Sequence, residues 1–285
     1  MTSWARFPTT WRTLRLWRKH ATLKRAWGLL QDFGYEQTDP DIFYGHLAED
    51  TVQLITSVTA GVHGSPDTSR PLEGKKILDV GGGPGYFGVA FSAAHAEYYT
   101  CEPDVGEMAA AGITLASSVR GSGLDLPFQD EAFDITYSSN VAEHVPEPWR
   151  MLDEMLRVTT PGGVVIYSYT CWLGPFGGHE TGLWPHYVGG EFAARRYERR
   201  HGHPPKNRWG QSLFDVSCGD GLWASEHIET AELVAAFPRY HPWWAWWMVH
   251  VPVLREFAVS NLVLVFRKAQ DGPITSAPAD DPLKG

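Results

Sequence analysis

Residues 78–85 combine an acidic side chain with a run of glycines, in the pattern D-x-G-x-G-x-G. Gly81, Gly83 and Gly85 lack a β-carbon, so they can adopt positive φ angles and let a ligand approach the backbone closely. Asp79 precedes them and can hold an ammonium group, directly or through water, whereas it would repel a diphosphate. The pattern predicts a binding site for a cofactor that carries a positive charge.

A competing interpretation uses the same turn. Residues 83–88 also fit G-x-G-x-x-G, the fingerprint of dinucleotide-binding proteins. Both interpretations expect an acid at the end of the second strand to bind ribose hydroxyls, and Glu102 supplies it in either case. On these residues alone, a nicotinamide-dependent reductase stays open as an alternative.

Four further motifs follow in order: LPF at residues 126–128, FD at 133–134, EHV at 143–145 and PGG at 161–163. With these motifs the chain resembles class I S-adenosylmethionine-dependent methyltransferases over roughly residues 76–169. The resemblance implies S-adenosyl-L-methionine as cofactor. It also implies an α/β fold with a Rossmann-like doubly wound sheet, an N-terminal helical extension and an insertion after the fifth strand.

The resemblance also assigns cofactor contacts by position. Glu102 would bind the ribose hydroxyls, Gly123 and Leu124 would flank the adenine, and Asn140 would lie beside the methionyl group. Ser122 departs from the family pattern, because an acid often accepts the adenine amino hydrogen there, and a hydroxyl accepts it more weakly. The full set is Asp79, Gly81, Gly83, Gly85, Glu102, Ser122, Gly123, Leu124 and Asn140.

Candidates for the acceptor side follow the fifth predicted strand. His179 and Glu180 come after the glycine-rich residues 174–178, and His144 lies near the cofactor by the same resemblance. A hydroxyl acceptor benefits from a nearby base, whereas a carboxylate acceptor needs none. We take all three as catalytic candidates, with a structural role open for each. Since no pair shows compact metal-ligand spacing, no metal is expected.

A narrower resemblance extends outside this core. Residues 33–40, 172–180 and 237–242 are similar to an actinobacterial group of methyltransferases associated with mycolate-containing cell envelopes and trehalose mycolate transport. It implies a small-molecule or lipid-linked acceptor from the envelope, without identifying that acceptor. A non-catalytic cofactor-binding accessory protein for envelope glycolipid transport is the alternative.

The elements that must position these residues alternate between strand and helix. Buried strands are predicted at residues 77–80, 98–101, 113–119, 133–138 and 163–169, with helices between them, which indicates βαβ units and a mostly parallel sheet. Further strands are predicted at 231–237 and 259–267, and a helix at 188–201. We divide the chain into a basic helical extension (1–30), a helical cap and linker (31–75), the methyltransferase domain (76–268) and a disordered tail (269–285). Acceptor-side insertions occupy 171–230 and 238–258.

Charge is distributed unevenly along the chain. The formal net charge is −9, yet residues 1–25 contain seven basic residues and no acid. With tryptophans at helical spacing, this segment predicts an interfacial helix on an anionic membrane, and packing against the protein's own body is the alternative. The tryptophan-rich residues 243–247 cannot all face one side of one element, so they meet core, partner or membrane.

Several classes of protein are disfavoured. The acidic body disfavours nucleic-acid binding, which needs a basic face. No apolar run of about 18 residues predicts a transmembrane helix, and no secretory signal is evident. Three widely spaced cysteines indicate a reducing compartment. We therefore expect a cytoplasmic protein, peripheral to the inner membrane, with its oligomeric state open.

Overall fold

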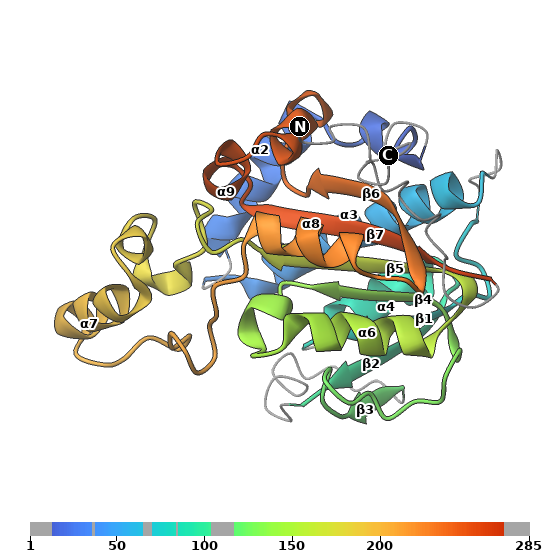
Figure 1. Ribbon diagram of the computed structural model, residues 1–285, viewed down its shortest axis with the longest axis horizontal. Helices are drawn as coiled ribbons and strands as arrows, with labels where there is room; N and C mark the ends of the chain where they lie inside the picture. Colours follow the sequence, from blue (N-terminus) through green and yellow to red (C-terminus); the bar gives the residue numbers. More distant parts are fainter. Residues whose placement is uncertain (1–12, 36–37, 65–69, 84, 104–116, 271–285) are drawn as a thin grey trace, which may run out of the picture.

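A seven-stranded sheet organises the molecule, which a computed structural model describes over residues 13–35, 38–64, 70–83, 85–103 and 117–270. The strand order is β3-β2-β1-β4-β5-β7-β6 (Figure 1). Strands β1 to β5 pair in parallel, whereas β7 is antiparallel to both β5 and β6. The strands are β1 (Lys76–Val80), β2 (Glu97–Glu102), β3 (Ser118–Arg120), β4 (Phe133–Ser139), β5 (Thr159–Thr170), β6 (Ala231–Pro238) and β7 (Asn261–Lys268).

This arrangement confirms the predicted doubly wound α/β fold. A dinucleotide-binding sheet with strand order 3-2-1-4-5-6 has no antiparallel strand between its last two members, so β7 is a real difference from that fold. The third predicted strand is the poorest match. β3 begins only at Ser118, and residues 104–116, which contain most of that prediction, lie outside the described part of the chain.

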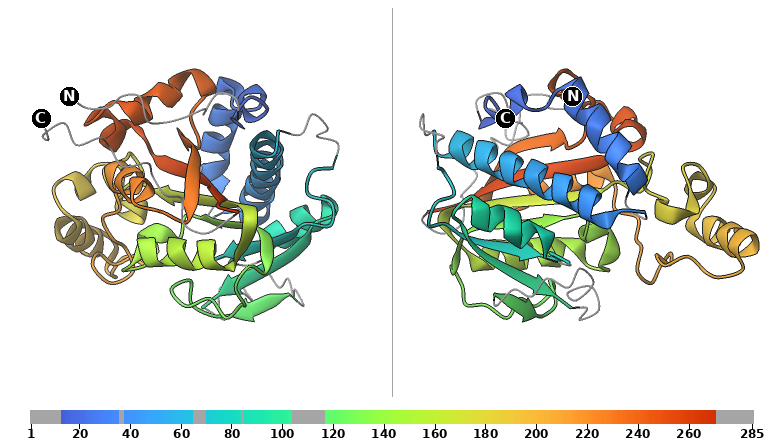
Figure 2. Two further views of the ribbon diagram at one scale, coloured as in Figure 1. Left: turned by 45° about the vertical axis from the view of Figure 1, so that its right-hand side comes forward. Right: turned by 180° about the vertical axis from the view of Figure 1, so that it is seen from behind.

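Helices cover both faces of the sheet. Helices α3 (Pro40–Val62) and α4 (Tyr86–Ala93) pack on one face, and α3 runs along it in the right-hand view of Figure 2. Helices α6 (Pro148–Val158) and α8 (Cys218–Glu226) pack on the other. Successive strand residues point to opposite faces, so Ile77 packs on the side of α3 and α4, and Leu78 packs on the side of α6 and α8. Burial on both faces explains the unbroken apolar run at residues 262–266 of β7.

The N-terminal segment packs on this body. It forms a short 3-10 helix, η1 (Trp17–Lys19), then α2 (Leu23–Asp32) and a second 3-10 turn, η2 (Phe33–Tyr35). Leu14 and Trp17 are fully buried in the core beside α3. Over the described residues the predicted helical extension is interrupted, because Thr22 caps a new helix by accepting from the Arg25 backbone N–H at 3.2 Å. Residues 1–12 lie outside the described residues.

The segment between β5 and β6 has two parts. The first contains η4 (His179–Thr181), η5 (Pro185–Tyr187) and α7 (Gly190–His201), and it projects from the body (Figure 1). The second is α8, which returns to the sheet, where Gly221 lies against the Tyr169 hydroxyl. The predicted insertion 171–230 thus includes a helix of the sheet layer. Between β6 and β7 lie η6 (Trp243–His250) and α9 (Leu254–Ala258).

Candidate functional site

The glycine turn joins the end of β1 to the start of α4. Gly81, Gly83 and Gly85 have φ angles of +83°, +54° and +92°, a region that favours glycine. A β-carbon on Gly81 would lie 2.4 Å from a methyl group of Val141, whereas nothing lies within 4 Å of one built on Gly83. The turn is therefore packed at its first glycine and open to a ligand at Gly83. Pro84 lies outside the described residues.

Asp79 supports this turn from beneath. Its carboxylate is buried, and Oδ2 accepts hydrogen bonds from the hydroxyls of Tyr98, at 2.7 Å, and Tyr137. A β-carbon on Gly82 would lie 2.7 Å from the same oxygen. Burial raises the pKa of Asp79 to about 7, although both tyrosine donors oppose the shift. Of the two modes predicted for Asp79, this geometry favours an indirect influence on a cationic ligand.

Glu102 ends β2 beside the same turn. Its Oε2 accepts a hydrogen bond from the Gly83 backbone N–H at 3.3 Å. Strands β1 and β2 are parallel and in register up to Val80 and Cys101, so the turn and Glu102 meet at one edge of the sheet. An open glycine beside a carboxylate suits a ribose whose hydroxyls donate hydrogen bonds. The residues present therefore fit a nucleoside cofactor.

The loop expected to flank the adenine is held close to α6. Ser122 Oγ accepts from the Leu124 backbone N–H at 3.1 Å. A β-carbon on Gly123 would lie 2.8 Å from the sulfur of Met151, so only glycine lets the loop pack this tightly. The Ser122 side chain thus stabilises the turn of the loop by accepting a hydrogen bond from the Leu124 backbone.

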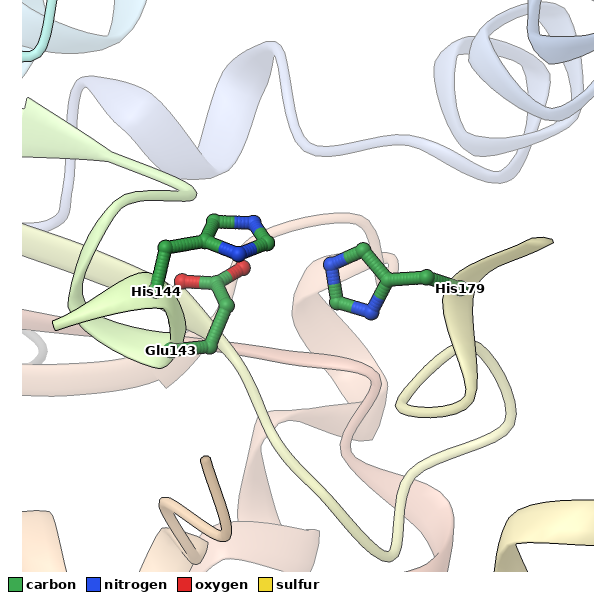
Figure 3. Close-up of side chains that lie close together, drawn as sticks. All are labelled: Glu143, His144 and His179. Carbon is green, nitrogen blue, oxygen red and sulfur yellow. The ribbon is translucent and has the colours of Figure 1, made fainter. Parts of the chain in front are cut away.

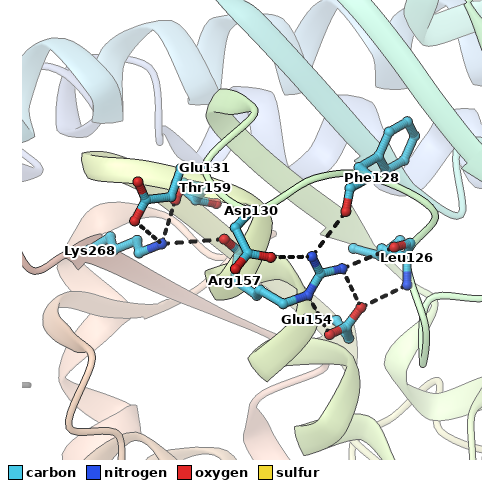
Figure 4. Close-up of polar contacts among 8 residues, drawn as sticks. All are labelled: Leu126, Phe128, Asp130, Glu131, Glu154, Arg157, Thr159 and Lys268. Carbon is cyan, nitrogen blue, oxygen red and sulfur yellow. Dashed lines mark hydrogen bonds and ion pairs between the residues drawn. The ribbon is translucent and has the colours of Figure 1, made fainter. Parts of the chain in front are cut away.

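The LPF motif follows this loop and is clamped by Arg157 (Figure 4). The guanidinium donates to the carbonyl oxygens of Leu126 and Phe128, both at 2.9 Å. Glu154 accepts from the Leu126 backbone N–H at 2.8 Å and pairs with Arg157. The hydrogen bonds from Arg157 lower the pKa of Glu154, although partial burial opposes them. The motif is therefore held in place through its backbone groups. The identity of its side chains does not predict these contacts.

Asn140 lies at the end of β4 with a φ angle of +58°. Its Oδ1 accepts hydrogen bonds from Asn261 Nδ2 at 2.8 Å and from Thr170 Oγ1 at 3.2 Å. Three strands thus hold one amide in place beside the glycine turn, where Val141 packs on Gly81. Sequence reasoning did not identify Thr170 or Asn261, because both contacts are distant along the chain.

The two candidate histidines come together. The ring centroids of His144 and His179 lie 5.0 Å apart, with the rings steeply inclined at 75°. Glu143 lies beside them, and Figure 3 shows the carboxylate and both rings facing one another. The linear spacing did not predict this group, because His179 reaches it from the projecting segment between β5 and β6.

Glu180 lies outside that group. Its carboxylate accepts from the backbone N–H of Asn207 at 2.7 Å and from Nδ2 of the same residue at 2.9 Å. Burial alone would raise the pKa of Glu180, but these hydrogen bonds outweigh it and the pKa is lowered. The geometry favours a role for Glu180 in holding the segment that carries His179.

Arg239 is a buried cation that sequence reasoning missed. It follows β6 within a motif quoted above, and it donates hydrogen bonds to Ser139 at the end of β4 and to Thr51 Oγ1 at 2.5 Å. Asp50 lies 4.0 Å away and also pairs with Arg25. The apolar residues next to Arg239 in the sequence are the one local sign that it is buried. They do not indicate its partners, which are distant along the chain.

Comparisons with known proteins bear on this site. Residues 78–167 match a family model described as a methyltransferase domain. A Mycobacterium marinum protein named "Uncharacterized methyltransferase" is 58% identical over 252 residues, which cover 87% of this chain and 95% of that protein. A Mycobacterium avium protein of the same name is 56% identical over 257 residues, covering 88% and 98%.

Among solved structures, an S-adenosylmethionine dependent methyltransferase from Mesorhizobium loti is similar, with a TM-score of 0.48 and 17% identity. The match covers 69% of this chain and 92% of that chain. The mycobacterial relatives settle the interpretation of the glycine turn against a nicotinamide-dependent reductase. The chain belongs to the methyltransferase family of these mycobacterial proteins, and the matched methyltransferase domain supports S-adenosylmethionine as its cofactor.

Proposed function

We propose that the protein methylates an amphiphilic, lipid-linked acceptor of the cell envelope while lying against the inner face of the membrane. One observation carries this proposal. Large exposed apolar side chains gather on three segments around the acceptor side: α2 with η2, the segment that carries His179, and η6 with α9. These side chains include Leu23, Trp27, Leu30, Phe33, Leu183, Trp184, Val188, Trp244, Trp247, Val253 and Phe257.

The three segments contact one another. The rings of Phe33 and Phe176 lie 5.5 Å apart, and those of Tyr187 and Phe257 lie 6.1 Å apart. The Trp243 backbone N–H donates to the Ala21 carbonyl oxygen at 2.8 Å, which joins η6 to the residues before α2. Exposed apolar side chains on segments that contact one another are typical of a protein or membrane contact. Tryptophan at such a surface suits the headgroup level of a bilayer.

The tryptophans of residues 243–247 differ in their exposure, as their spacing predicts. Trp246 is buried in the core, whereas Trp244 and Trp247 are each more than half exposed. The guanidinium of Arg18 lies 3.6 Å above the ring centroid of Trp243, so this residue helps to fasten the N-terminal segment. Within the described part of the chain, no helix is long and apolar enough to cross a bilayer. The proposed contact therefore lies along the membrane surface.

The nine assigned residues would hold the cofactor, with Glu102 on the ribose and Asn140 beside the methionyl group. When bound, S-adenosylmethionine supplies an electrophilic methyl group on a sulfonium leaving group. The chain must then align the acceptor and exclude water. His144 and His179 would hold the acceptor oxygen, and a neutral ring nitrogen can receive its proton if the acceptor is a hydroxyl. Glu180 would keep His179 in position through Asn207.

Labelling in cells tests this function. Cells with and without the protein would be fed methionine with an isotope-labelled methyl group, and lipid and water-soluble extracts would be compared. We expect one class of envelope lipid to lose its label when the protein is absent. Label lost only from a water-soluble compound would contradict a lipid-linked acceptor. Cofactor binding without any change in label would favour the non-catalytic accessory protein.

A further inference from the structure

Glu143, His144 and His179 form a group with metal-ligand chemistry. Glu143 and His144 belong to η3 (Ala142–His144), directly after β4, and His179 begins η4. One ligand atom from each residue lies within 4.8 Å of the other two. Ligand atoms around one ion lie about 3–3.5 Å apart when each bond is about 2.1 Å long. The three side chains in Figure 3 thus need only a small closing movement to share an ion.

Both imidazole rings are oriented by backbone carbonyl groups. His144 Nδ1 lies 2.7 Å from the Ser212 carbonyl oxygen, and His179 Nδ1 lies 3.1 Å from that of Gly177. A carbonyl oxygen only accepts, so each Nδ1 carries the proton and each Nε2 of the neutral ring keeps its lone pair. Histidines that ligate metals have this same outer contact, which fixes the tautomer and the ring orientation.

The buried carboxylate is an independent sign of a missing cation. Glu143 is only 1% exposed. Its Oε1 accepts from the Thr170 backbone N–H at 3.0 Å. Its Oε2 is buried and, among the residues that the structure describes, has no hydrogen-bond partner. An ionised oxygen without a donor is costly to bury, and a bound cation would compensate it.

We propose that Glu143, His144 and His179 bind one divalent first-row metal ion, with Zn²⁺ as the first choice. Two imidazoles and one carboxylate are a ligand set that zinc accepts, and three protein ligands leave a coordination position open. Linear spacing hid this set, because two ligands are adjacent and the third arrives from a different segment. Binding of the ion does not depend on the proposed function.

The role of the ion deepens the proposed function and rests on it. The open position would take an acceptor oxygen beside the cofactor's methyl group, and the ion would lower the pKa of a hydroxyl there. With both imidazole rings bound to the ion, the ion replaces them as the group that holds the acceptor oxygen, and the hydroxyl proton goes to solvent instead of to a ring nitrogen. The O–C bond forms, and the electron pair of the breaking S–C bond stays on sulfur. No further reactant is needed.

The test is metal binding by the full chain, after chelator treatment, with ZnCl₂ as the titrant in calorimetry. Co²⁺ as a second probe would report ligand geometry through its visible absorption. We expect one ion per chain. Glu143→Gln, His144→Gln and His179→Asn should each weaken binding by more than the roughly 10–100-fold that loss of an outer contact costs. His227→Gln, at the exposed histidine that directly follows α8, is the matched control and should bind as the unaltered protein does.

Two outcomes would overturn the site: no zinc, cobalt or iron(II) uptake at millimolar concentration, or equal affinities in all variants. Far-ultraviolet circular dichroism and S-adenosylhomocysteine titration verify that each variant is folded. His179→Asn remains informative if Glu143→Gln fails to fold, because His179 lies in the projecting segment and not in the core. Zinc binding together with no labelled lipid would preserve the site and reject the proposed acceptor.

Discussion

Asp79, which lies beneath the glycine turn, makes the stability of the folded protein depend on pH. Because burial raises its pKa to about 7, the folded protein prefers the neutral acid. The folded pKa lies above the unfolded value near 4, so the stability that Asp79 contributes is complete below about pH 4 and is lost as the pH rises through about 7.

Replacing Asp79 by asparagine tests this linkage. Asp79→Asn cannot ionise, so its free energy of unfolding should rise relative to the unaltered protein by about 3 kcal/mol between pH 5 and pH 8. Urea unfolding of the cofactor-free proteins at both pH values measures the difference. Any loss of the Tyr98 or Tyr137 contact shifts both values together, so the comparison between pH values is the informative one. Parallel pH curves would contradict the buried acid.

At the scale of elements, α2 presents an apolar face to solvent. None of its residues is buried, although Thr22 caps it and Leu23, Trp27 and Leu30 recur on one side. Helix stability in water does not require such a face, since isolated short helices gain little from exposed apolar groups. The exposed apolar face of α2 is better explained by the proposed membrane contact, which would cover it.

Substitution of Leu23, Trp27 and Leu30 by serine should release the protein from vesicles that contain anionic lipid. Loss of three apolar side chains that are partly inserted into the bilayer should weaken binding by roughly 30-fold or more, or about 2 kcal/mol. Co-sedimentation measures the effect, and S-adenosylhomocysteine affinity should not change. Trp223→Ser on α8 is the control, because Trp223 is 61% exposed but lies outside the three apolar segments. Equal loss of binding in the control would point to a non-specific effect.

Across the whole molecule, a buried ionic network joins distant parts of the chain. Arg25 Nε and Nη2 donate to Asp50 at 2.5 and 2.8 Å, and Arg25 Nη1 donates to the Arg239 carbonyl oxygen at 3.1 Å. Asp50 comes from α3 and Arg239 follows β6, so the network connects the N-terminal segment to the last hairpin. The basic residues before α2 are therefore partly structural, and deletion of residues 1–25 would also remove Leu14 and Trp17 from the core.

Asp50→Ala should destabilise the protein by about 3–5 kcal/mol, because it leaves the buried Arg239 and the largely buried Arg25 without their acid. Chemical unfolding at neutral pH provides the measurement. Glu73→Ala is a suitable comparison, because Glu73 forms an exposed ion pair with Arg70 and should change stability by less than about 1 kcal/mol. Similar small effects in both variants would show that Asp50 does not hold the network together.

The local features of this protein were readable from its sequence. The glycine turn follows from backbone stereochemistry, and the strands follow from apolar runs between turn residues, so both depend on neighbours along the chain. The helix at residues 190–201 agrees closely with the helix predicted at 188–201 for the same reason. Strand β7 was expected as a strand, but its antiparallel place between β5 and β6 depends on pairing that no local pattern records.

Only the tertiary structure decided which side chains meet. The sequence treats Trp17 and Trp27 alike, yet the first is buried against α3 and the second faces solvent, because the chain ends one helical turn and begins another between them. The sequence also separates His144 from His179, and the projecting segment after β5 brings them together. Contacts of this kind depend on the folding of long loops onto a sheet edge, where the energetic preference belongs to the whole assembly of elements and not to any one of them.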